Sequence, residues 1–463
     1  MTKLHMQAAE AVGLSLRCNH LSPTSASRRN SFFRGPLLIM PLVAAAVVSA
    51  PCGIAQNLNT VQAAQAQALV DTAGVNTHLT YTNTVYFTNW PQIFSALTTL
   101  GVKHVRDGYW NVVANDPVAE EHQELAEAGI TTDYVIPWGN EPSPQQLQQF
   151  AGQVGDMEAI EASNECDSPG NCGGGGNTGI ANVVAMMPSL LSDAQAADVP
   201  LMGPSYLLPT SYPTTGNIAS LMNLNSLHLY FGGRNPGSPG WGAEDAQGND
   251  YGSFAYWINQ SNVDAPAIVP VVTETGYLSF PTTSTPFTIP ESVEASYVPR
   301  TLLLAFQNGY QECFFYQLVD DPSSTPGYGL LNSDLSPKPA YTALQNLISL
   351  MSDPGGSFSP GTLSFNVTGG GSDLQQMLFE KSNGDFYLVL WLEDPSYNPV
   401  TNQAISVTPE NVTIQLQNGY ATTTDYQFNN AGSVTAFNQP ENNGSAILTV
   451  TDQISVIKII PAS

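Results

Sequence analysis

The sequence predicts an α/β protein: a (β/α)8 TIM barrel followed by a small all-β sandwich domain. Its 463 residues are enough for one large barrel with an appended domain. Across residues 56–352, eight short β-branched runs alternate with helical patterns, which is the strand count of a (β/α)8 barrel. Residues 353–463 hold short strands separated by Asn/Gly turns, without helical periodicity, and this pattern is typical of a β-sandwich.

Residues 1–55 form a segment of different composition. Three arginines between residues 28 and 34 precede an apolar run at residues 37–48, and small residues follow. This order is that of a secretory signal, and the apolar run is well short of the roughly 20 residues that a membrane span needs. We therefore expect a leader that is cleaved near Ala50 or Ala55, and a secreted or periplasmic mature protein with no membrane association after signal removal.

The composition restricts the class of partner. Only 11% of the residues are charged, 42% are hydrophobic, and the formal net charge is −26. The hydrophobic fraction is high enough for a sizeable core, which argues against a disordered chain. A protein this acidic would repel phosphate groups, so we expect no nucleic-acid partner. The composition fits a soluble exported enzyme that acts on neutral material, and we expect a monomer.

The predicted elements follow one another along the chain at uneven spacing. The eight barrel strands end, in order, at residues 76–78, 105–107, 135–138, 162–165, 202–205, 227–230, 272–274 and 315–317. Amphipathic helical patterns lie between them at residues 90–100, 145–154, 180–196 and 293–308. The strands of the sandwich are expected at residues 361–367, 375–380, 385–392, 412–416, 447–450 and 454–460.

Two glutamates follow barrel strands in the same kind of setting. Glu165 follows Asn164 at the end of the predicted fourth strand, and Glu274 ends the predicted seventh strand. Because the carboxyl ends of barrel strands meet at one mouth, both side chains should face the same pocket, where barrel enzymes keep their active sites. Burying an unpaired carboxylate at a strand end costs free energy, so two of them that face one pocket are hard to explain by structure alone.

Paired carboxylates are the groups that glycoside hydrolysis requires. One protonates the leaving oxygen, and in a retaining enzyme the other attacks the anomeric carbon. Asn164 can hydrogen-bond a sugar hydroxyl, so we expect Glu165 to be the acid/base and Glu274 the nucleophile. Arg106 and the hydroxyl of Tyr230 are available to hold the Glu274 carboxylate.

The order of these motifs resembles that of the clan A glycoside hydrolases, which are retaining (β/α)8 enzymes. Their Asn-Glu after strand four and Glu after strand seven match Asn164-Glu165 and Glu274. The strand-two arginine matches Arg106, the strand-six His-x-Tyr matches residues 228–230, and residues 329–341 resemble the stretch that leads into the last helix. The resemblance covers about residues 73–350. It implies a retaining mechanism, a β-linked carbohydrate substrate and no cofactor.

Two positions depart from the usual clan pattern. The Asn-Glu pair is followed by Cys166 where many members have proline, and the eighth strand leads into Phe315, Tyr316 and Gln317 where many have tryptophan. These departures concern the exact family and the residues beneath the sugar, and they leave the two glutamates in place.

Further candidates for substrate binding are aromatic or titratable residues near the strand ends. His228 and Tyr230 lie two positions apart and so face the same side of a strand. Aromatic side chains can stack on the apolar face of a sugar, although the same residues serve equally well in a core. The aromatic candidates are Trp138, Tyr277 and Tyr316, with Trp110, Trp241 and the acidic Asp320 as weaker ones.

The cysteines and histidines indicate no metal site. Cys166 and Cys172 close a short loop directly after Glu165, so a disulfide is plausible in an oxidising compartment, and free buried thiols are an equal alternative. No Cys/His cluster has the spacing of a zinc site. We expect neither a metal nor another cofactor.

The sequence thus predicts a secreted retaining glycoside hydrolase that cleaves β-linked bonds of an extracellular poly- or oligosaccharide by double displacement. Two alternatives stay open. One is a non-catalytic carbohydrate-binding or surface protein on a barrel scaffold. The other is a transglycosylase that uses the same two glutamates.

Overall fold

The computed structural model describes residues 58–238, 252–282, 285–321, 326–439 and 444–461. The predicted leader at residues 1–55, its cleavage positions and Trp241 lie outside these residues. Within the described ranges, no helix is both long enough and apolar enough to cross a membrane.

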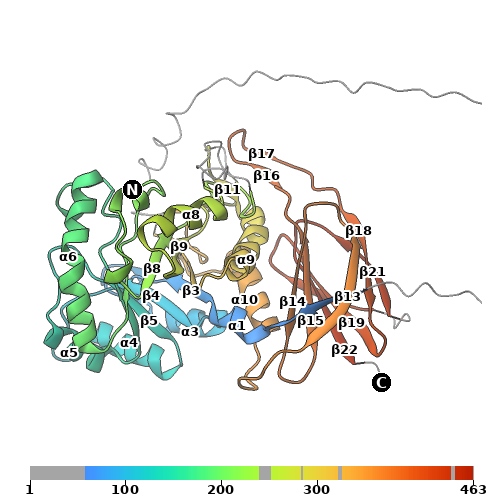
Figure 1. Ribbon diagram of the computed structural model, residues 1–463, viewed down its shortest axis with the longest axis horizontal. Helices are drawn as coiled ribbons and strands as arrows, with labels where there is room; N and C mark the ends of the chain where they lie inside the picture. Colours follow the sequence, from blue (N-terminus) through green and yellow to red (C-terminus); the bar gives the residue numbers. More distant parts are fainter. Residues whose placement is uncertain (1–57, 239–251, 283–284, 322–325, 440–443, 462–463) are drawn as a thin grey trace, which may run out of the picture. The chain divides into compact units, whose positions relative to one another are not determined.

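The described residues contain a closed barrel of eight parallel strands, as the sequence predicts (Figure 1). Around the barrel the order is β12-β3-β4-β5-β6-β7-β8-β9, so each strand neighbours the next one in the chain. The strands are β3 (Ala73–Asn76), β4 (His104–Gly108), β5 (Thr131–Val135), β6 (Met157–Glu161), β7 (Leu201–Met202), β8 (Leu224–His228), β9 (Val269–Thr275) and β12 (Cys313–Phe315).

Helices surround these strands in Figure 1. They are α1 (Ala66–Asp71), α2 (Val85–Thr88), α3 (Trp90–Leu100), α4 (Pro117–Glu127), α5 (Pro144–Val154), α6 (Gly176–Ala197), α7 (Ser211–Thr215), α8 (Phe254–Asp264), α9 (Glu291–Gln307) and α10 (Pro339–Met351). Helix α3 shows why they form. Its apolar residues Ile93, Leu97 and Leu100 recur at helical spacing and are buried, and Gly101 ends it with φ of 84°, a backbone conformation that favours glycine.

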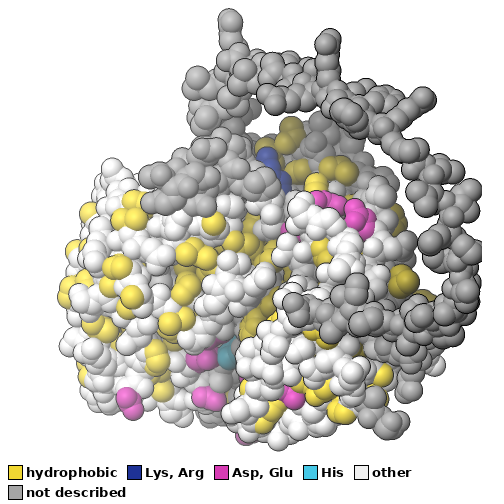
Figure 2. Space-filling model, turned by 45° about the vertical axis from the view of Figure 1, so that its right-hand side comes forward, with side chains coloured by type: hydrophobic (Ala, Val, Ile, Leu, Met, Phe, Trp, Pro, Cys, Tyr) yellow, Lys and Arg dark blue, Asp and Glu magenta, His cyan; other side chains and the backbone are white. Residues whose placement is uncertain are grey.

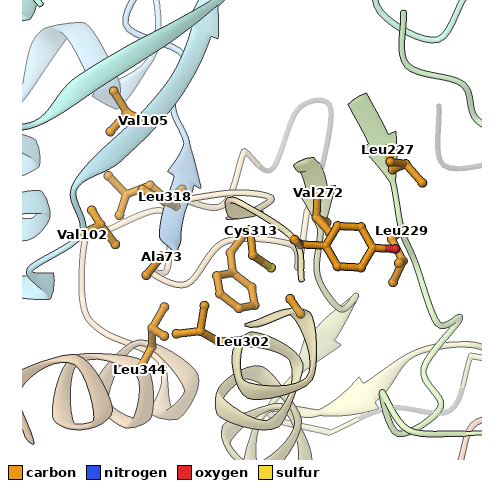
Figure 3. Packing of buried hydrophobic residues seen from close by; sticks show 14 of the residues in the cluster. Ala73, Val102, Val105, Leu227, Leu229, Val272, Leu302, Cys313, Leu318 and Leu344 are labelled. Carbon is orange, nitrogen blue, oxygen red and sulfur yellow. The ribbon is translucent and has the colours of Figure 1, made fainter. Parts of the chain in front are cut away.

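The apolar core lies between the strands and the helices (Figure 3). Val105 in β4 and Val272 in β9 are buried there, and Leu302 in α9 and Leu344 in α10 pack into the same cluster. Burying a side chain of this kind contributes about 1.5–3 kcal/mol. Because side chains alternate along a strand, the neighbours of an outward-facing valine face the inside of the barrel. Polar residues of β4 therefore line the barrel interior.

Two further sheets hold the C-terminal strands together with β1 (Asn59–Gln62) and β2 (Ala64–Gln65), and their strand pairs are antiparallel except for the parallel pair of β2 with β14. The first has the order β1-β13-β18-β21, and the second has the order β2-β14-β15-β22-β19-β20. Apolar residues from both sheets share one buried cluster, which makes the pair a sandwich. The strands are β13 (Thr362–Gly369), β14 (Leu374–Glu380), β15 (Phe386–Leu392), β18 (Glu410–Leu416), β19 (Tyr420–Phe428), β20 (Val434–Asn438), β21 (Ser445–Val450) and β22 (Ser455–Pro461). Two short pairs are β10 (Ser279–Phe280) with β11 (Ile289–Pro290), and β16 (Tyr397–Asn398) with β17 (Gln403–Ala404).

The start of the described chain belongs to this sandwich. Strand β1 (Asn59–Gln62) pairs with β13, and β2 (Ala64–Gln65) pairs with β14. The sequence-based division placed these residues with the barrel, because a short polar strand carries no mark of a partner 300 residues away. The chain therefore enters the sandwich, builds the barrel and returns to the sandwich.

A buried arginine connects the sandwich to the barrel. Arg300 in α9 donates through Nε to the Glu393 carboxylate at 3.0 Å and through Nη1 to the Asp394 carbonyl at 3.2 Å. The Glu393 carboxylate also accepts hydrogen bonds from Asn235 Nδ2 at 2.8 Å and from the Gly237 amide at 2.9 Å. Residues 235–237 lie in the loop that follows β8. The sandwich thus holds a loop at the carboxyl end of the barrel.

Candidate active site

Arg106 organises the interior of the barrel at the carboxyl ends of its strands. From β4, its guanidinium donates to Glu161 Oε2 at 2.5 Å, to Glu274 Oε1 at 2.8 Å, to Asn164 Oδ1 at 2.8 Å and to Asn76 Oδ1 at 2.9 Å. Burial works against the charged guanidinium, but the charges of Glu161 and Glu274 outweigh it and raise the Arg106 pKa. One cation therefore serves several acceptors from different strands.

Glu161 is a buried carboxylate of the candidate site that the sequence pattern did not single out. It ends β6, is fully buried and receives two hydrogen bonds from Arg106 and one from Ser226 Oγ at 2.8 Å. The sequence does contain a signal for it. Besides Glu165 and Glu274, Glu161 is a further carboxylate on the predicted fourth strand, four residues before Glu165. A buried carboxylate needs a cation, and an inward-facing arginine two strands away in the barrel could have been assigned to it.

Glu274 lies in β9, and fixed donors contact both of its oxygens. Oε1 accepts from Arg106, and Oε2 accepts from the Tyr230 hydroxyl at 3.0 Å. The Nδ1 atom of His228 lies 3.4 Å from Oε2. Burial, together with the charge of Glu274, raises the pKa of Tyr230 well above its usual value, so this hydroxyl keeps its proton and donates. The carboxylate is held in one orientation.

Glu165 lies beyond the end of its strand. The sequence pattern predicts strand geometry up to this residue, but β6 ends at Glu161, and Glu165 has φ of 44° in the left-handed region. Its amide donates to Ser205 Oγ at 3.4 Å, and its carbonyl accepts from Asn171 Nδ2 at 3.1 Å. These contacts turn the side chain toward the barrel mouth, which strand alternation alone does not achieve.

The loop that follows Glu165 is closed on itself. Cys166 and Cys172 form a disulfide with a Cα–Cα distance of 5.1 Å, which is one of the two states that the sequence allowed. Gly179 packs so close to this loop that a Cβ atom would lie 1.9 Å from the Cys166 carbonyl oxygen, so only glycine fits. Cys313 is a buried free thiol.

His228 joins the two glutamates. Its Nδ1 lies 3.1 Å from Glu165 Oε1, and its Nε2 lies 3.5 Å from Arg106 Nη2. Because Arg106 can only donate, Nε2 faces a donor, and the proton belongs on Nδ1 toward Glu165. Burial lowers the His228 pKa, but the charges of Glu274 and Glu165 outweigh burial and raise it. One oxygen of each glutamate and one ring nitrogen lie within 4.8 Å of one another.

Aromatic rings lie near these carboxylates. The ring of Tyr328, which the sequence analysis did not single out, is 6.1 Å from that of Tyr230 and 5.9 Å from that of Tyr316. Burial raises the Tyr328 pKa, and the charges of Glu165 and Glu274 add to the rise. Trp138 is 40% exposed and lies beside Gly173 of the disulfide loop. Trp138 and Tyr316 therefore keep positions from which they can meet a ligand.

Three other candidates have structural surroundings. Tyr277 is 1% exposed and packs against Phe231 and Tyr297, as a core residue does. Asp320 forms an ion pair with Lys338 at 2.9 Å. The ring of Trp110 lies over a buried histidine of α4, 5.3 Å between centroids. An aromatic residue after a strand suits a core as well as a pocket, and the sequence does not distinguish the two.

Two groups of side chains among the described residues could hold a metal ion. One is Glu165, His228 and Glu274, and the other is His104, Glu158 and Glu312. In the first group Arg106 and Tyr230 already occupy both oxygens of Glu274. That arrangement suits a reacting carboxylate better than a metal ligand.

Comparisons with known proteins identify structures of similar fold. No protein-family model and no curated protein matches the sequence. Among solved structures, the chain is similar to the GH39 enzyme from Xanthomonas axonopodis pv. citri, with a TM-score of 0.57 and 12% identity over 87% of this chain and 96% of that one. It is also similar to the catalytic domain of GH30 xylanase C from Talaromyces cellulolyticus, with a TM-score of 0.53 and 10% identity over 88% and 99% of the two chains.

A third similar structure is AbfB, a family 51 α-L-arabinofuranosidase from Bifidobacterium longum, with a TM-score of 0.53 and 12% identity over 87% and 97% of the two chains. The predicted fold, a TIM barrel with a β-sandwich, is therefore confirmed, as is its likeness to clan A glycoside hydrolases. At such low identity the likeness concerns the fold, and the exact family is not assigned.

Proposed function

We propose that the protein is a retaining glycoside hydrolase. The observation that carries this proposal is the pair of buried glutamates at the carboxyl ends of β6 and β9, with one oxygen of each within 4.8 Å. Retaining enzymes keep their carboxyl groups about 5–5.5 Å apart, whereas inverting enzymes need about 6.5–9.5 Å to admit a water molecule. The spacing between Glu165 and Glu274 suits direct attack by a carboxylate.

In the first step, Glu274 is the nucleophile. Its carboxylate attacks the anomeric carbon while the bond from that carbon to the leaving oxygen breaks, and Glu165 transfers its proton to that oxygen. Arg106 and Tyr230 hold Glu274 in place through both oxygens. The product of the step is a glycosyl ester of Glu274 and a released alcohol.

In the second step, Glu165 acts as a base. Its carboxylate takes a proton from water, and the water oxygen attacks the anomeric carbon and displaces Glu274 with net retention. His228 contacts Glu165 through Nδ1 at 3.1 Å and so orients the carboxyl group in both steps. Glu165 ends the cycle protonated, as it began.

The substrate class that we propose is a neutral, β-linked poly- or oligosaccharide. The fold neighbours are glycoside hydrolases, which supports a carbohydrate substrate. On the face that Figure 2 shows, hydrophobic side chains are scattered among uncharged surface, and charged side chains are sparse. Exposed Trp138 and half-buried Tyr316 offer rings for the apolar faces of sugars. The β-linkage rests on the sequence resemblance to clan A.

We also propose that the protein is exported. The support is the order of basic residues, apolar run and small residues in positions 28–55. N-terminal sequencing of the protein recovered outside the producing cells tests this. A start close to residue 51 or 56 is expected, and recovery only inside the cells would contradict export.

A substrate panel tests the proposed activity. The protein from Gln56 onward is incubated with β-glucans, xylans, mannans and galactans, and reducing ends and product lengths are measured. Cleavage by the wild type that is lost in Glu165→Gln and in Glu274→Gln is expected. Glu158→Gln makes the same chemical change at the other end of the barrel and should retain activity. Equal retention of one polymer by wild type and variants, without cleavage, would favour the carbohydrate-binding alternative.

A further inference from the structure

A second cluster of titratable side chains lies at the opposite end of the barrel. His104 begins β4, Glu158 lies in β6, and Glu312 immediately precedes β12. One ring nitrogen and one oxygen of each glutamate lie within 4.8 Å of one another. His104 and Arg106 are two residues apart on β4, so both side chains point into the barrel, His104 nearer the amino ends of the strands. We call these three residues the lower cluster.

The hydrogen bonds of His104 leave its Nδ1 facing the lower cluster. Its Nε2 lies 2.7 Å from the Asp71 carbonyl oxygen, which can only accept, so Nε2 carries a proton. Its Nδ1 lies 2.6 Å from Glu158 Oε2 and 3.0 Å from Thr131 Oγ1. A histidine that binds a metal through one nitrogen usually donates its other ring N–H to a carbonyl or carboxylate in this way.

A fully buried carboxylate adjoins the same cluster. Asp133 in β5 has no exposed surface, and no donor among the described residues reaches either of its oxygens. Its carboxyl group contacts that of Glu312, whose Oε2 also lacks a donor there, and it lies close to Glu158. Two facing carboxylates have acceptors only. A proton or a cation must lie between them to offset the cost of burial.

No arginine or lysine in the described part of the chain supplies the missing charge. Of the ion pairs that the described residues form, only that of His104 with Glu158 involves this cluster. The next charged group above it in the barrel is Glu161, whose charge also acts on Asp133, and Arg106 already neutralises that one. The lower cluster and Asp133 together hold three carboxyl groups against one imidazole.

We propose that the lower cluster binds a divalent transition-type cation, with Zn²⁺ as its best representative. His104 Nδ1, Glu158 and Glu312 would be ligands, and the charge of the ion would compensate the orphaned Asp133 carboxylate beside them. Ligand atoms that bind a metal at about 2.0–2.2 Å in a tetrahedron are ~3.4 Å apart. The ligand atoms of the lower cluster lie within 4.8 Å of one another, so small side-chain movements would bring them to this spacing. A mixed imidazole and carboxylate set favours Zn²⁺ over Ca²⁺, which prefers six to eight oxygens.

The position implies a structural role. The ligands come from β4, β6 and the residue before β12, with Asp133 on β5, so one ion would connect separate parts of the barrel wall. Features at the amino end of such barrels serve stability, because the active site is at the carboxyl end. Zn²⁺ is therefore expected to raise the unfolding temperature without entering the reaction.

Zn²⁺ titration of the full chain tests the proposal. The protein is purified without a histidine tag, treated with EDTA, dialysed and titrated calorimetrically with Zn²⁺ and, separately, Ca²⁺. We expect Zn²⁺ to bind in preference to Ca²⁺, and its affinity to fall at least ~10-fold in Glu312→Gln and in the partly exposed Glu158→Gln. Glu165→Gln is the matched control, because it removes a ligand from the other candidate cluster, and it should bind Zn²⁺ like the wild type.

Several outcomes would overturn the proposal. They are no Zn²⁺ uptake by the wild type, equal affinity for Ca²⁺, or uptake that only Glu165→Gln abolishes. If the Glu312 and Glu158 variants do not fold, anomalous diffraction at the zinc edge from wild-type crystals locates the ion without a variant. Zn²⁺ density between His104 and Glu312 supports the site, and density elsewhere, or none, excludes it.

Discussion

The barrel carries two clusters made of the same side chains at opposite ends of its strands. At the carboxyl end, His228 joins Glu165 and Glu274, and at the amino end, His104 joins Glu158 and Glu312. In each, two carboxylate oxygens and a ring nitrogen lie within 4.8 Å. The clusters differ in what balances them. Arg106 supplies a fixed positive charge to the upper one and to the buried Glu161 beside it, whereas the buried Asp133 beside the lower one has no such cation among the described residues.

This difference shows that the counter-charge decides what a carboxylate pair can do. The Arg106 guanidinium permanently pairs with Glu274 of the upper pair and with Glu161, so Glu274 can lie close to Glu165 without a bound ion. The lower pair lacks such a partner among the described residues and can be compensated by something mobile, either a proton or a metal ion. The same three residue types therefore serve a proposed reaction at one end and a proposed ion site at the other.

Replacing one glutamate at each end gives the largest expected contrast. Glu274→Gln should lower kcat by about 10⁴-fold or more, because the amide cannot form the glycosyl ester. Glu312→Gln should leave kcat within a factor of a few. Initial rates on the polymer that the wild type cleaves provide the measurement. Similar losses in both variants would mean that the two ends are not functionally separate.

Glu165→Gln should have the next largest effect on activity. Loss of general acid–base catalysis costs about 10²–10⁴-fold. An aryl glycoside with an acidic leaving group needs little protonation, so its first step should be much less affected than that of a natural substrate. A burst of released phenol followed by slow turnover is expected in stopped-flow traces. Equal losses for both substrates would remove Glu165 from the acid role.

Arg106→Met should destabilise the fold strongly. The change leaves Glu161 and Glu274 buried without their cation, and breaking a buried ion pair in this way costs about 3–5 kcal/mol. Urea unfolding, followed by circular dichroism, measures the free energy. A loss below about 1 kcal/mol would show that the upper cluster does not depend on its arginine.

Asp133→Asn should stabilise the metal-free protein, whereas Arg106→Met should destabilise the fold. The amide of asparagine can donate to Glu312, where two carboxyl groups now face each other, so the free energy of unfolding should rise by about 1–3 kcal/mol. The same urea experiment in EDTA measures it. Destabilisation in EDTA would show that the carboxyl group is already compensated within the protein.

The smallest expected effect is the contribution of His228 to the pH dependence of the unfolding free energy. The charges of Glu274 and Glu165 outweigh burial and raise its pKa in the folded protein. The stability that it contributes is thus fully present below about pH 6.5 and is lost as the pH rises through the folded pKa, at about 1.4 kcal/mol per pKa unit. His228→Gln should lack this loss. If the unfolding free energies of the wild type and of His228→Gln changed in parallel from pH 6 to 9, the proposed contribution of His228 would be contradicted.

Local pattern determined much of this protein. The alternation of apolar strands and amphipathic helices predicted the barrel, because periodicity reflects which face of an element is buried. The glutamates could be paired because parallel barrel strands bring their carboxyl ends to one mouth, so Glu165 and Glu274 meet although 109 positions separate them. The same rule predicted that Arg106, His228 and Tyr230 lie at this mouth. For these residues, position along a strand was enough.

Tertiary structure alone decided the rest. Glu161 acquires its partner Arg106 only when barrel closure brings the inward-facing side chains of β4 and β6 together, and Tyr328 meets Tyr230 from a loop without regular periodicity. The pairing of β1 with β13 and the lower cluster likewise join residues that are far apart in the chain. The physical reason is common to all of them. Burial and charge compensation depend on which side chains meet in space, whereas sequence periodicity reports only which side of an element is buried.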